Sequence, residues 1–184
     1  MDSRSLVRIA LLAAVIGVLG LLPGIALPIA GGVPITAQTL GVMLAGIVLG
    51  ARHGALAVLL FLAVVALGAP LLAGGRGGLG VFFGPSAGFL IGFVPAAYVT
   101  GALMARLKGM RVFPAALIAA LGGGLVVEYL FGICGLMIVA RMNFLQAVVA
   151  TAAFVPGDVL KAVATAFLAE ASHRTYPAAI ASRA

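Results

Sequence analysis

Apolar residues fill this chain so continuously that no segment is left over for a soluble domain. Hydrophobic residues make up 64% of the 184 positions and charged residues only 8%, whereas an ordinary soluble domain carries about 25% charged residues. Such a composition suits the interior of a lipid bilayer. The sequence therefore predicts an all-α integral membrane protein, with residues 1–184 forming a single membrane domain.

The apolar segments have the lengths that membrane-spanning helices need. A bilayer core about 30 Å thick is crossed by about 20 helical residues. We expect six helices, near residues 6–22, 35–50, 53–68, 86–106, 112–140 and 155–171. The second and third nearly touch, so a tight turn at 52–54 must join them. The fifth is long and contains three consecutive glycines, which favours a tilt, a kink or an end outside the hydrocarbon.

Two connections are too apolar for ordinary solvent-exposed loops. The first, at 22–34, reads "LPGIALPIAGGVP" and carries no charge, and the second, at 68–88, reads "GAPLLAGGRGGLGVFFGPSAG" and carries one. Non-helical backbone at membrane depth is tolerated only where it is covered by protein or lines a cavity. We therefore expect both glycine-rich connections to fold over or into a site, and 22–34 to act as a lid.

Lysines and arginines collect on one side of the predicted membrane. If the N-terminus is cytoplasmic, eight lie on that side: Arg4, Arg8, Arg52, Arg106, Lys108, Arg111, Arg174 and Arg183. Arg76 and Arg141 then lie outside. This bias follows the positive-inside rule. We expect a multi-pass protein of the inner (cytoplasmic) membrane, with both termini cytoplasmic and both glycine-rich connections on the extracellular side.

The net charge of +7 does not indicate nucleic-acid binding, because the basic residues are scattered between apolar segments and form no basic stripe. The single cysteine, Cys134, excludes a disulfide framework and a Cys-rich metal site. No metal and no cofactor is expected.

Asp158 and Lys161 lie three residues apart in the apolar sixth segment, so they share one face of a helix. A charge at the bilayer centre costs about 2.5–3.5 kcal/mol by insertion scales. The two side chains either neutralise each other or form a polar site that faces a cavity. Pro156 suits the first turn of a helix, so we expect the helix to start there, after a separate segment at 143–154, and a continuous, kinked helix from 145 is the alternative. Asp158 then lies in the first turn, reached from outside.

The second connection contains "GGRGG" at 74–78. Gly75 and Gly77 let the backbone come close to a ligand, and Arg76 is either a ligand contact or a solvated loop arginine. Phe89 and Phe93, which follow in the next helix, could form apolar walls of a small-molecule site or simply pack against helices and lipid.

Three stretches carry a family resemblance: "VPITAQTLGVMLAGIVLG" at 33–50, "LAGGRGGLGVFFGPSAGFLIGF" at 72–93 and "FVPGDVLKA" at 154–162. The chain resembles the BioY family, the biotin-specific S-components of energy-coupling-factor vitamin transporters. The resemblance implies a six-helix membrane subunit that captures biotin from outside and works with a membrane-embedded coupling subunit and ATPase subunits. The ligand-contacting acid and base of the family map onto Asp158 and Lys161. Its polar loop residue maps onto Arg76, where arginine replaces the asparagine associated with that position.

The chemistry of biotin suits these residues. Its ureido ring has two N–H donors and one carbonyl acceptor, and its chain ends in a carboxylate. Asp158 can accept from an ureido N–H, and Lys161 can donate to the carbonyl or to the carboxylate. Both assignments of Lys161 stay open.

Small residues recur on the first helix, where Ala10, Ala14 and Gly17 share one face. Such a face lets another helix approach closely. The resemblance implies that the coupling subunit docks there, and internal packing is the alternative. Besides this subunit, the ATPases and biotin, the expected partner is membrane lipid.

Parts of the sequence are also compatible with other functions. "GPSAG" at 84–88 could place Ser86 as the nucleophile of an intramembrane protease, but His53 and His173 are predicted on the opposite side of the membrane. We therefore expect no enzyme. The chain could serve another vitamin or transport by itself, although it has no P-loop pattern for ATP hydrolysis. Glu128, in the fifth helix, could relay protons, and is expected to pair with a polar group in the bundle.

Overall fold

The computed structural model describes residues 2–180. Its helices are α1 Ser3–Gly20, α2 Gln38–Ala66, α3 Ala87–Arg106, α4 Val112–Ala120, α5 Glu128–Val139, α6 Phe144–Ala152 and α7 Val155–Thr175. The shorter elements are the strands β1 Ile25–Ala26 and β2 Pro34–Ile35, the 3-10 helices η1 Pro28–Ala30, η2 Leu79–Phe83 and η4 Pro177–Ala179, and the π-helix η3 Leu121–Val127. Among the described residues, four helices are long and apolar enough to span a membrane, or five if α6 and α7 form one bent span. The protein is a mostly helical, multi-pass membrane protein.

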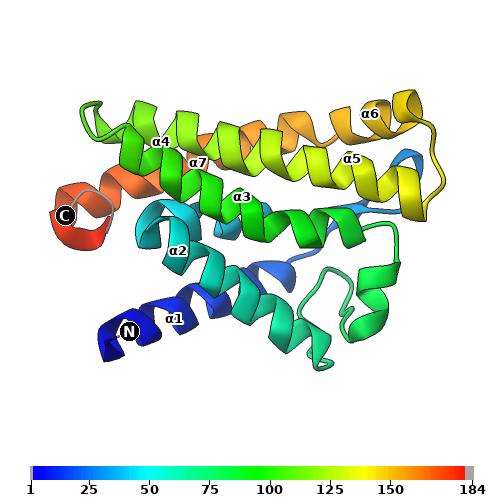
Figure 1. Cartoon of the computed structure of the whole chain (residues 1–184), viewed down its shortest axis with the longest axis horizontal. Coiled ribbons are helices and arrows are strands. Elements are labelled where there is room, and N and C mark those ends of the chain that lie inside the picture. The colour runs from blue at the N-terminus through cyan, green and yellow to red at the C-terminus, as the bar shows by residue number, and fades with distance from the viewer. Residues whose placement is uncertain (1, 181–184) are drawn as a thin grey trace.

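The helices run along one long axis, and most connections between them fall at its two ends (Figure 1). α1 begins and α7 ends at one end, which we call the terminal end. The strands β1 and β2, η2 and α6 lie towards the other, which we call the hairpin end. Seven of the eight basic residues predicted to be cytoplasmic belong to elements and connections of the terminal end, and Arg183, the eighth, lies outside the described residues.

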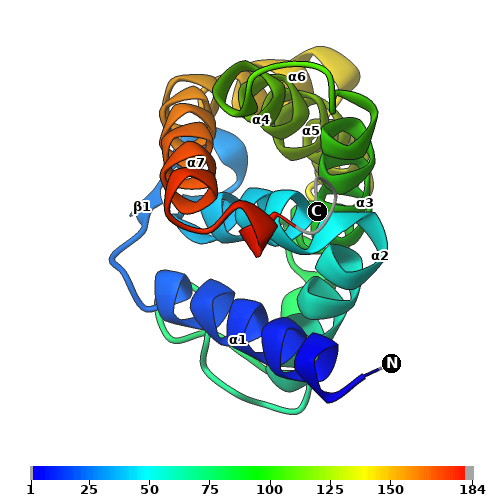
Figure 2. The ribbon, with the colours of Figure 1, turned by 90° about the vertical axis from the view of Figure 1, so that its left-hand side faces the viewer.

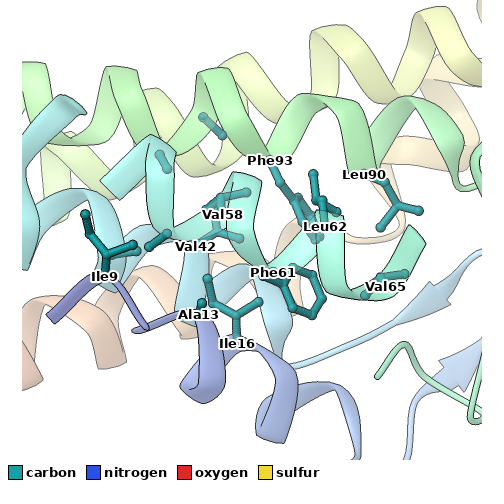
Figure 3. Packing of buried hydrophobic residues seen from close by; sticks show 14 of the residues in the cluster. Ile9, Ala13, Ile16, Val42, Val58, Phe61, Leu62, Val65, Leu90 and Phe93 are labelled. Carbon is teal, nitrogen blue, oxygen red and sulfur yellow. The ribbon is translucent and has the colours of Figure 1, made fainter. Parts of the chain in front are cut away.

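α1 lies at the edge of the bundle, against the second half of α2 (Figure 2). Asp2 caps its N-terminus by accepting a hydrogen bond from the backbone N–H of Ser5. The buried face of α1 points toward α2 and α3 (Figure 3). The labelled members of this cluster are Ile9, Ala13, Ile16, Val42, Val58, Phe61, Leu62, Val65, Leu90 and Phe93.

α2 reverses direction in its middle. Gly50 has a φ of 79°, in the left-handed region that favours glycine. After Gly50 the chain folds back on itself. A Cβ at Gly54 would lie 2.7 Å from the carbonyl oxygen of Ala45, whereas in a straight helix the two positions would be about 13 Å apart. The predicted second and third helices are therefore the two arms of α2, at 38–49 and 51–66. The turn lies at Gly50 and not at the predicted 52–54, which remains helical.

The predicted fifth helix is one run from 112 to 139 through α4, η3 and α5. Its glycines fall in the π-helical turn, where Gly123 lies against Thr100 of α3 and Gly124 against Met43 of α2, with no room for a Cβ at either position. The three-glycine stretch thus serves close packing inside the bundle.

α6 and α7 meet at an angle of 49°. Asn143 and Gln146 form a capping box that starts α6, and Pro156 lies in the first turn of α7. The sequence prediction of a separate segment before a helix that starts near Pro156 agrees with this arrangement.

The two glycine-rich connections have structure of their own. In the first, β1 and β2 pair as a small antiparallel hairpin, which the sequence did not predict. Ala30 and Val33 of this hairpin are buried in one cluster with Phe89 and Phe154. The second connection forms a tight loop in which Leu72 bridges to Arg76, followed by η2.

Candidate functional site

Asp158 is the centre of a buried hydrogen-bond cluster at the start of α7. Asp158 is only 3% exposed. Lys161 Nζ lies 2.7 Å from Asp158 Oδ1, and Thr39 Oγ1 donates to the same oxygen at 3.2 Å. Tyr129 donates its hydroxyl to Asp158 Oδ2 at 2.7 Å. The cluster therefore joins the first turns of α2, α5 and α7.

Local sequence explains why a carboxylate is stable in this position. Pro156 lies in the first helical turn, and Asp158 follows in the same turn. The unpaired N–H groups of a helix start, and the helix dipole, favour a negative charge there. A carboxylate offers about four acceptor positions, so with three donors in place Asp158 has room for about one more.

A cavity opens beside this cluster. Both predicted charged residues of α7 line it, and so do Arg76 and Phe89. Its full lining is Val33, Pro34, Ile35, Thr36, Gln38, Thr39, Leu72, Arg76, Ser86, Phe89, Leu90, Phe93, Glu128, Phe154, Asp158 and Lys161. The centres of water molecules have about 50 Å³ available in it, which is room for a few waters. A larger ligand would require its walls to move apart.

Arg76 belongs to the cavity wall. Its Nε donates to the Ala73 carbonyl at 3.1 Å, and its Nη1 donates to Ser86 Oγ at 3.5 Å. Gly75 and Gly77, predicted to lie against a ligand, do not line this cavity. They shape the loop instead: Gly75 has a φ of 69°, and Gly77 packs against the Ala69 backbone with no room for a Cβ.

Aromatic side chains form one apolar wall. Phe89 packs edge-on against Phe154, with ring centroids 5.6 Å apart, and Phe93 also lines the cavity. Gly132 of α5 lies directly against the Phe89 ring. Phe89, Phe93 and Phe154 thus lie in the wall of this cavity, and the contact of Phe89 with a ligand stays a prediction.

Thr39 and Tyr129 were missed by the sequence analysis. The polar run "TAQT" at 36–39, at the head of an apolar helix, and the adjacent "EY" inside another could have indicated them. Neither pattern says that the residues meet Asp158, because Thr39 is 119 positions away.

Glu128 also lines the cavity and is 2% exposed. The sequence analysis expected it to pair with a polar group in the bundle. That expectation is wrong for Oε2, which has no hydrogen-bond partner among the described residues. Two donors of this region, the Tyr129 hydroxyl and Lys161 Nζ, point to Asp158 instead.

Ser86 faces the cavity as the acceptor from Arg76, a partner that orients a hydroxyl but supplies no base. Among residues 2–180, no group of three His, Cys, Asp or Glu side chains could hold a metal ion.

The small residues of α1 lie on a different face of the protein. Ala10 and Ala14 are exposed, whereas Gly17 is buried beneath Leu71. All three line an apolar groove between α1 and the second arm of α2. We call this surface the α1 groove, and its residues are Ala10, Ala13, Ala14, Gly17, Val18, Leu21, Leu60, Phe61, Val64 and Leu71.

The chain is similar to known proteins along nearly its whole length. It matches the BioY family over residues 1–178. It is 52% identical over 182 residues to a Rhizobium etli protein named biotin transporter BioY, covering 96% of this chain and 97% of the relative. A Rhodobacter capsulatus protein of the same name is 48% identical over 189 residues, covering 98% of each.

A solved structure has the same fold. It is the crystal structure of the S-component for biotin from an ECF-type ABC transporter, with a TM-score of 0.86, 31% identity and 95% of each chain covered. Taken with the matches along the sequence, this similarity gives the identification: the chain belongs to the BioY family.

Proposed function

We propose that this protein is the biotin-capturing S-component of an energy-coupling-factor transporter. The observation that carries the proposal is the cavity beside the buried Asp158–Lys161 pair, in a chain of the BioY family. The pair is retained in an apolar bundle although apolar residues could replace it at little cost to stability. The protein acts by binding, and its relatives are named transporters.

The polarity of the cavity suits the two ends of biotin. Asp158 is 3% exposed and can accept one further N–H, which the ureido ring supplies. Lys161 and Arg76 are less deeply buried and can hold the carboxylate. Phe89, Phe93 and Phe154 flank the apolar thioether ring. We therefore place the ring beside Asp158 and the carboxylate on the side of Arg76.

Biotin enters from the outer face in this proposal. The elements at the hairpin end carry Arg76 and Arg141, whereas those at the terminal end carry most of the basic residues, which the positive-inside rule assigns to the cytoplasm. We accordingly assign the protein to the inner membrane with both termini cytoplasmic. The hairpin at 25–35 covers the cavity through Val33, Pro34 and Ile35, and we assign it the role of a lid.

The coupling subunit is proposed to dock at the α1 groove. Exposed alanines on a membrane helix let a partner helix approach closely, and Ala10 and Ala14 are four residues apart. ATPase subunits would supply the energy through that coupling subunit.

Retention of radiolabelled biotin by the purified protein, compared with thiamine and riboflavin, tests this function. We expect biotin alone to be retained and to be displaced by unlabelled biotin. Retention of another vitamin without biotin would make the protein an S-component of different specificity. Uptake by vesicles that contain only this chain would favour a self-sufficient transporter.

A further inference from the structure

Glu128 is a second acid in the cavity, and the proposed contacts of Asp158 and Lys161 leave it without a role. It is the first residue of α5, directly after the π-helix η3. Its backbone carbonyl faces Gly92 of α3, and its side chain contributes to the cavity lining. Single π-helical turns often occur at functional sites because they change the direction of the residues that follow.

Two buried side-chain atoms lack a hydrogen-bond partner in the described part of the chain: Glu128 Oε2 and Thr100 Oγ1. Thr100, a residue of α3, is fully buried against the glycines of η3 and does not contribute to the cavity lining. Both oxygens are enclosed by protein, but Glu128 contributes to the cavity lining and Thr100 does not. When the cavity walls move apart for a ligand, the unpaired Glu128 oxygen therefore lies beside the space that opens, whereas the Thr100 hydroxyl stays within the helix contact.

The surroundings of Glu128 favour its neutral form. An isolated buried carboxylate is so unfavourable that such a group takes up a proton instead. Both cations of the cavity are already engaged, Lys161 with Asp158 and Arg76 with Ala73 and Ser86. With Glu128 neutral, the charged side chains that line the cavity are two cations and one anion, which leaves one net positive charge for an anionic ligand.

We propose that Glu128 binds the ureido ring of biotin as a neutral carboxylic acid. The assignment rests on the function proposed above. A neutral carboxyl group has one O–H donor and one carbonyl acceptor, so it can form two parallel hydrogen bonds with a urea: its O–H donates to the urea carbonyl, and it accepts one urea N–H. Asp158 then accepts the second N–H at its remaining acceptor position, and all three polar atoms of the ring are satisfied.

Biotin affinity of three variants in lipid nanodiscs tests the proposal. Glu128→Gln keeps one acceptor and an N–H donor without charge, so its dissociation constant should stay within about threefold of the parent. Glu128→Met keeps the length of the side chain but neither hydrogen bond, and should weaken binding about tenfold or more. Thr100→Val, the matched control, removes the other unpartnered oxygen and should bind as the parent does.

Affinities that differ from these expectations would contradict the proposal in distinguishable ways. Parent-like affinity in Glu128→Met would show that Glu128 does not contact biotin. Equal losses in Glu128→Gln and Glu128→Met would show that the acid is needed as a charged group. If the parent itself retains no biotin, the proposed function fails, and this result is separate from either outcome for Glu128.

A measurement on the unmodified protein covers the case in which Glu128→Met does not fold. Calorimetric titration with biotin in buffers of different ionisation enthalpy counts the protons exchanged on binding. The charged or titratable groups around Glu128 are Asp158, Lys161, Tyr129 and Arg76. We expect no net proton uptake between about pH 6.5 and 8, because Glu128 is already protonated. Uptake of close to one proton would overturn the assignment of a neutral acid in the free protein.

Discussion

The cavity and the α1 groove are built in opposite ways. In the cavity, two acids and two bases lie within an apolar bundle, and Asp158 and Glu128 are no more than 3% exposed. In the α1 groove no charged side chain from residues 2–180 contributes to the lining, and small side chains lie on the surface. Exposed leucine and valine are ordinary on a helix that faces lipid, as at Leu11 and Val18 of α1.

The difference indicates two separate recognition tasks. Charges inside a membrane bundle are unfavourable unless they are satisfied, so they mark a ligand site. Small residues on the surface of a membrane helix leave a groove into which another helix can pack. Among the described residues the two surfaces have no lining residue in common, and they are built from different chemistry, so substitutions should be able to disable either one while the other continues to work.

The sharpest test of the cavity is the double variant Asp158→Asn with Lys161→Gln. It removes the charges of the Asp158–Lys161 pair and leaves an uncharged polar side chain at each position. Each charged hydrogen bond contributes about 1.5–3 kcal/mol, so we expect biotin affinity to fall about a hundredfold or more. Equilibrium binding to the purified variant measures the loss, and its thermal unfolding shows whether it still folds.

The same helix provides a matched control. Glu170 and Arg174 form an ion pair with an N–O distance of 2.7 Å at the other end of α7, where the Arg174 side chain is 74% exposed. Glu170→Gln with Arg174→Gln removes the same number of charges far from the cavity and should bind biotin normally. If the Asp158 and Lys161 variant also binds normally, the pair only neutralises its two charges.

The next largest effect is expected at the α1 groove. Ala10→Trp with Ala14→Trp would fill the groove and hold a partner helix away. We expect co-purification with the coupling subunit to be abolished and biotin binding to be unchanged. Co-purification from membranes that contain all subunits, followed by biotin binding on the same preparation, measures both.

Leu11→Trp with Val15→Trp is the control for bulk on α1. These residues are also four apart, but neither lines the groove, so assembly should persist. If the Ala10 and Ala14 variant assembles normally, the docking surface lies elsewhere. If it loses biotin binding instead, the alanines serve the internal packing of the protein.

The contrast between the two regions also explains what could be predicted from the sequence. Asp158 and Lys161 are conspicuous because they are charges in an apolar segment, and Ala10 and Ala14 because their spacing matches one helical turn. Both are local patterns. The contact of Thr39 with Asp158 joins positions 119 residues apart, and it depends on how α2 and α7 pack together, which composition and spacing do not specify.

The position of the α2 turn and the presence of the β-hairpin were also not predicted, because composition and spacing do not specify them. Polar Arg52 and His53 look like a turn, but a left-handed φ is the actual requirement, and Gly50 meets it. The strands β1 and β2 have two residues each, too short for any alternation of apolar and polar residues to develop. Their pairing is stabilised by the contacts of the hairpin with the bundle.

A smaller effect within the cavity is expected from Tyr129→Phe. The substitution removes the hydroxyl that donates to Asp158 Oδ2 at 2.7 Å and keeps the ring. One lost hydrogen bond to a charged group should weaken biotin binding about tenfold, less than loss of the charged pair. Affinity equal to that of the parent would mean that Tyr129 orients Asp158 without affecting the ligand. Tyr98→Phe, at an exposed tyrosine of α3 outside the cavity lining, is the control.

The smallest expected change is a movement of the hairpin. The cavity has room for only a few waters, so part of its wall must move to admit a vitamin, and we expect that part to be the hairpin, which contributes Val33, Pro34 and Ile35. Spin labels can be attached at Ala26, which is exposed in β1, and at Leu79, which is 67% exposed in η2. We expect the distance distribution between labels at Ala26 and Leu79 to narrow when biotin binds, because the hairpin then closes over the ligand.

The control is a pair of labels at Leu60 and Leu79, neither of which lies in the hairpin, and its distance distribution should not change when biotin binds. A distribution that is already narrow without biotin and stays unchanged would mean that the hairpin is a fixed wall, and that entry requires a different element to move.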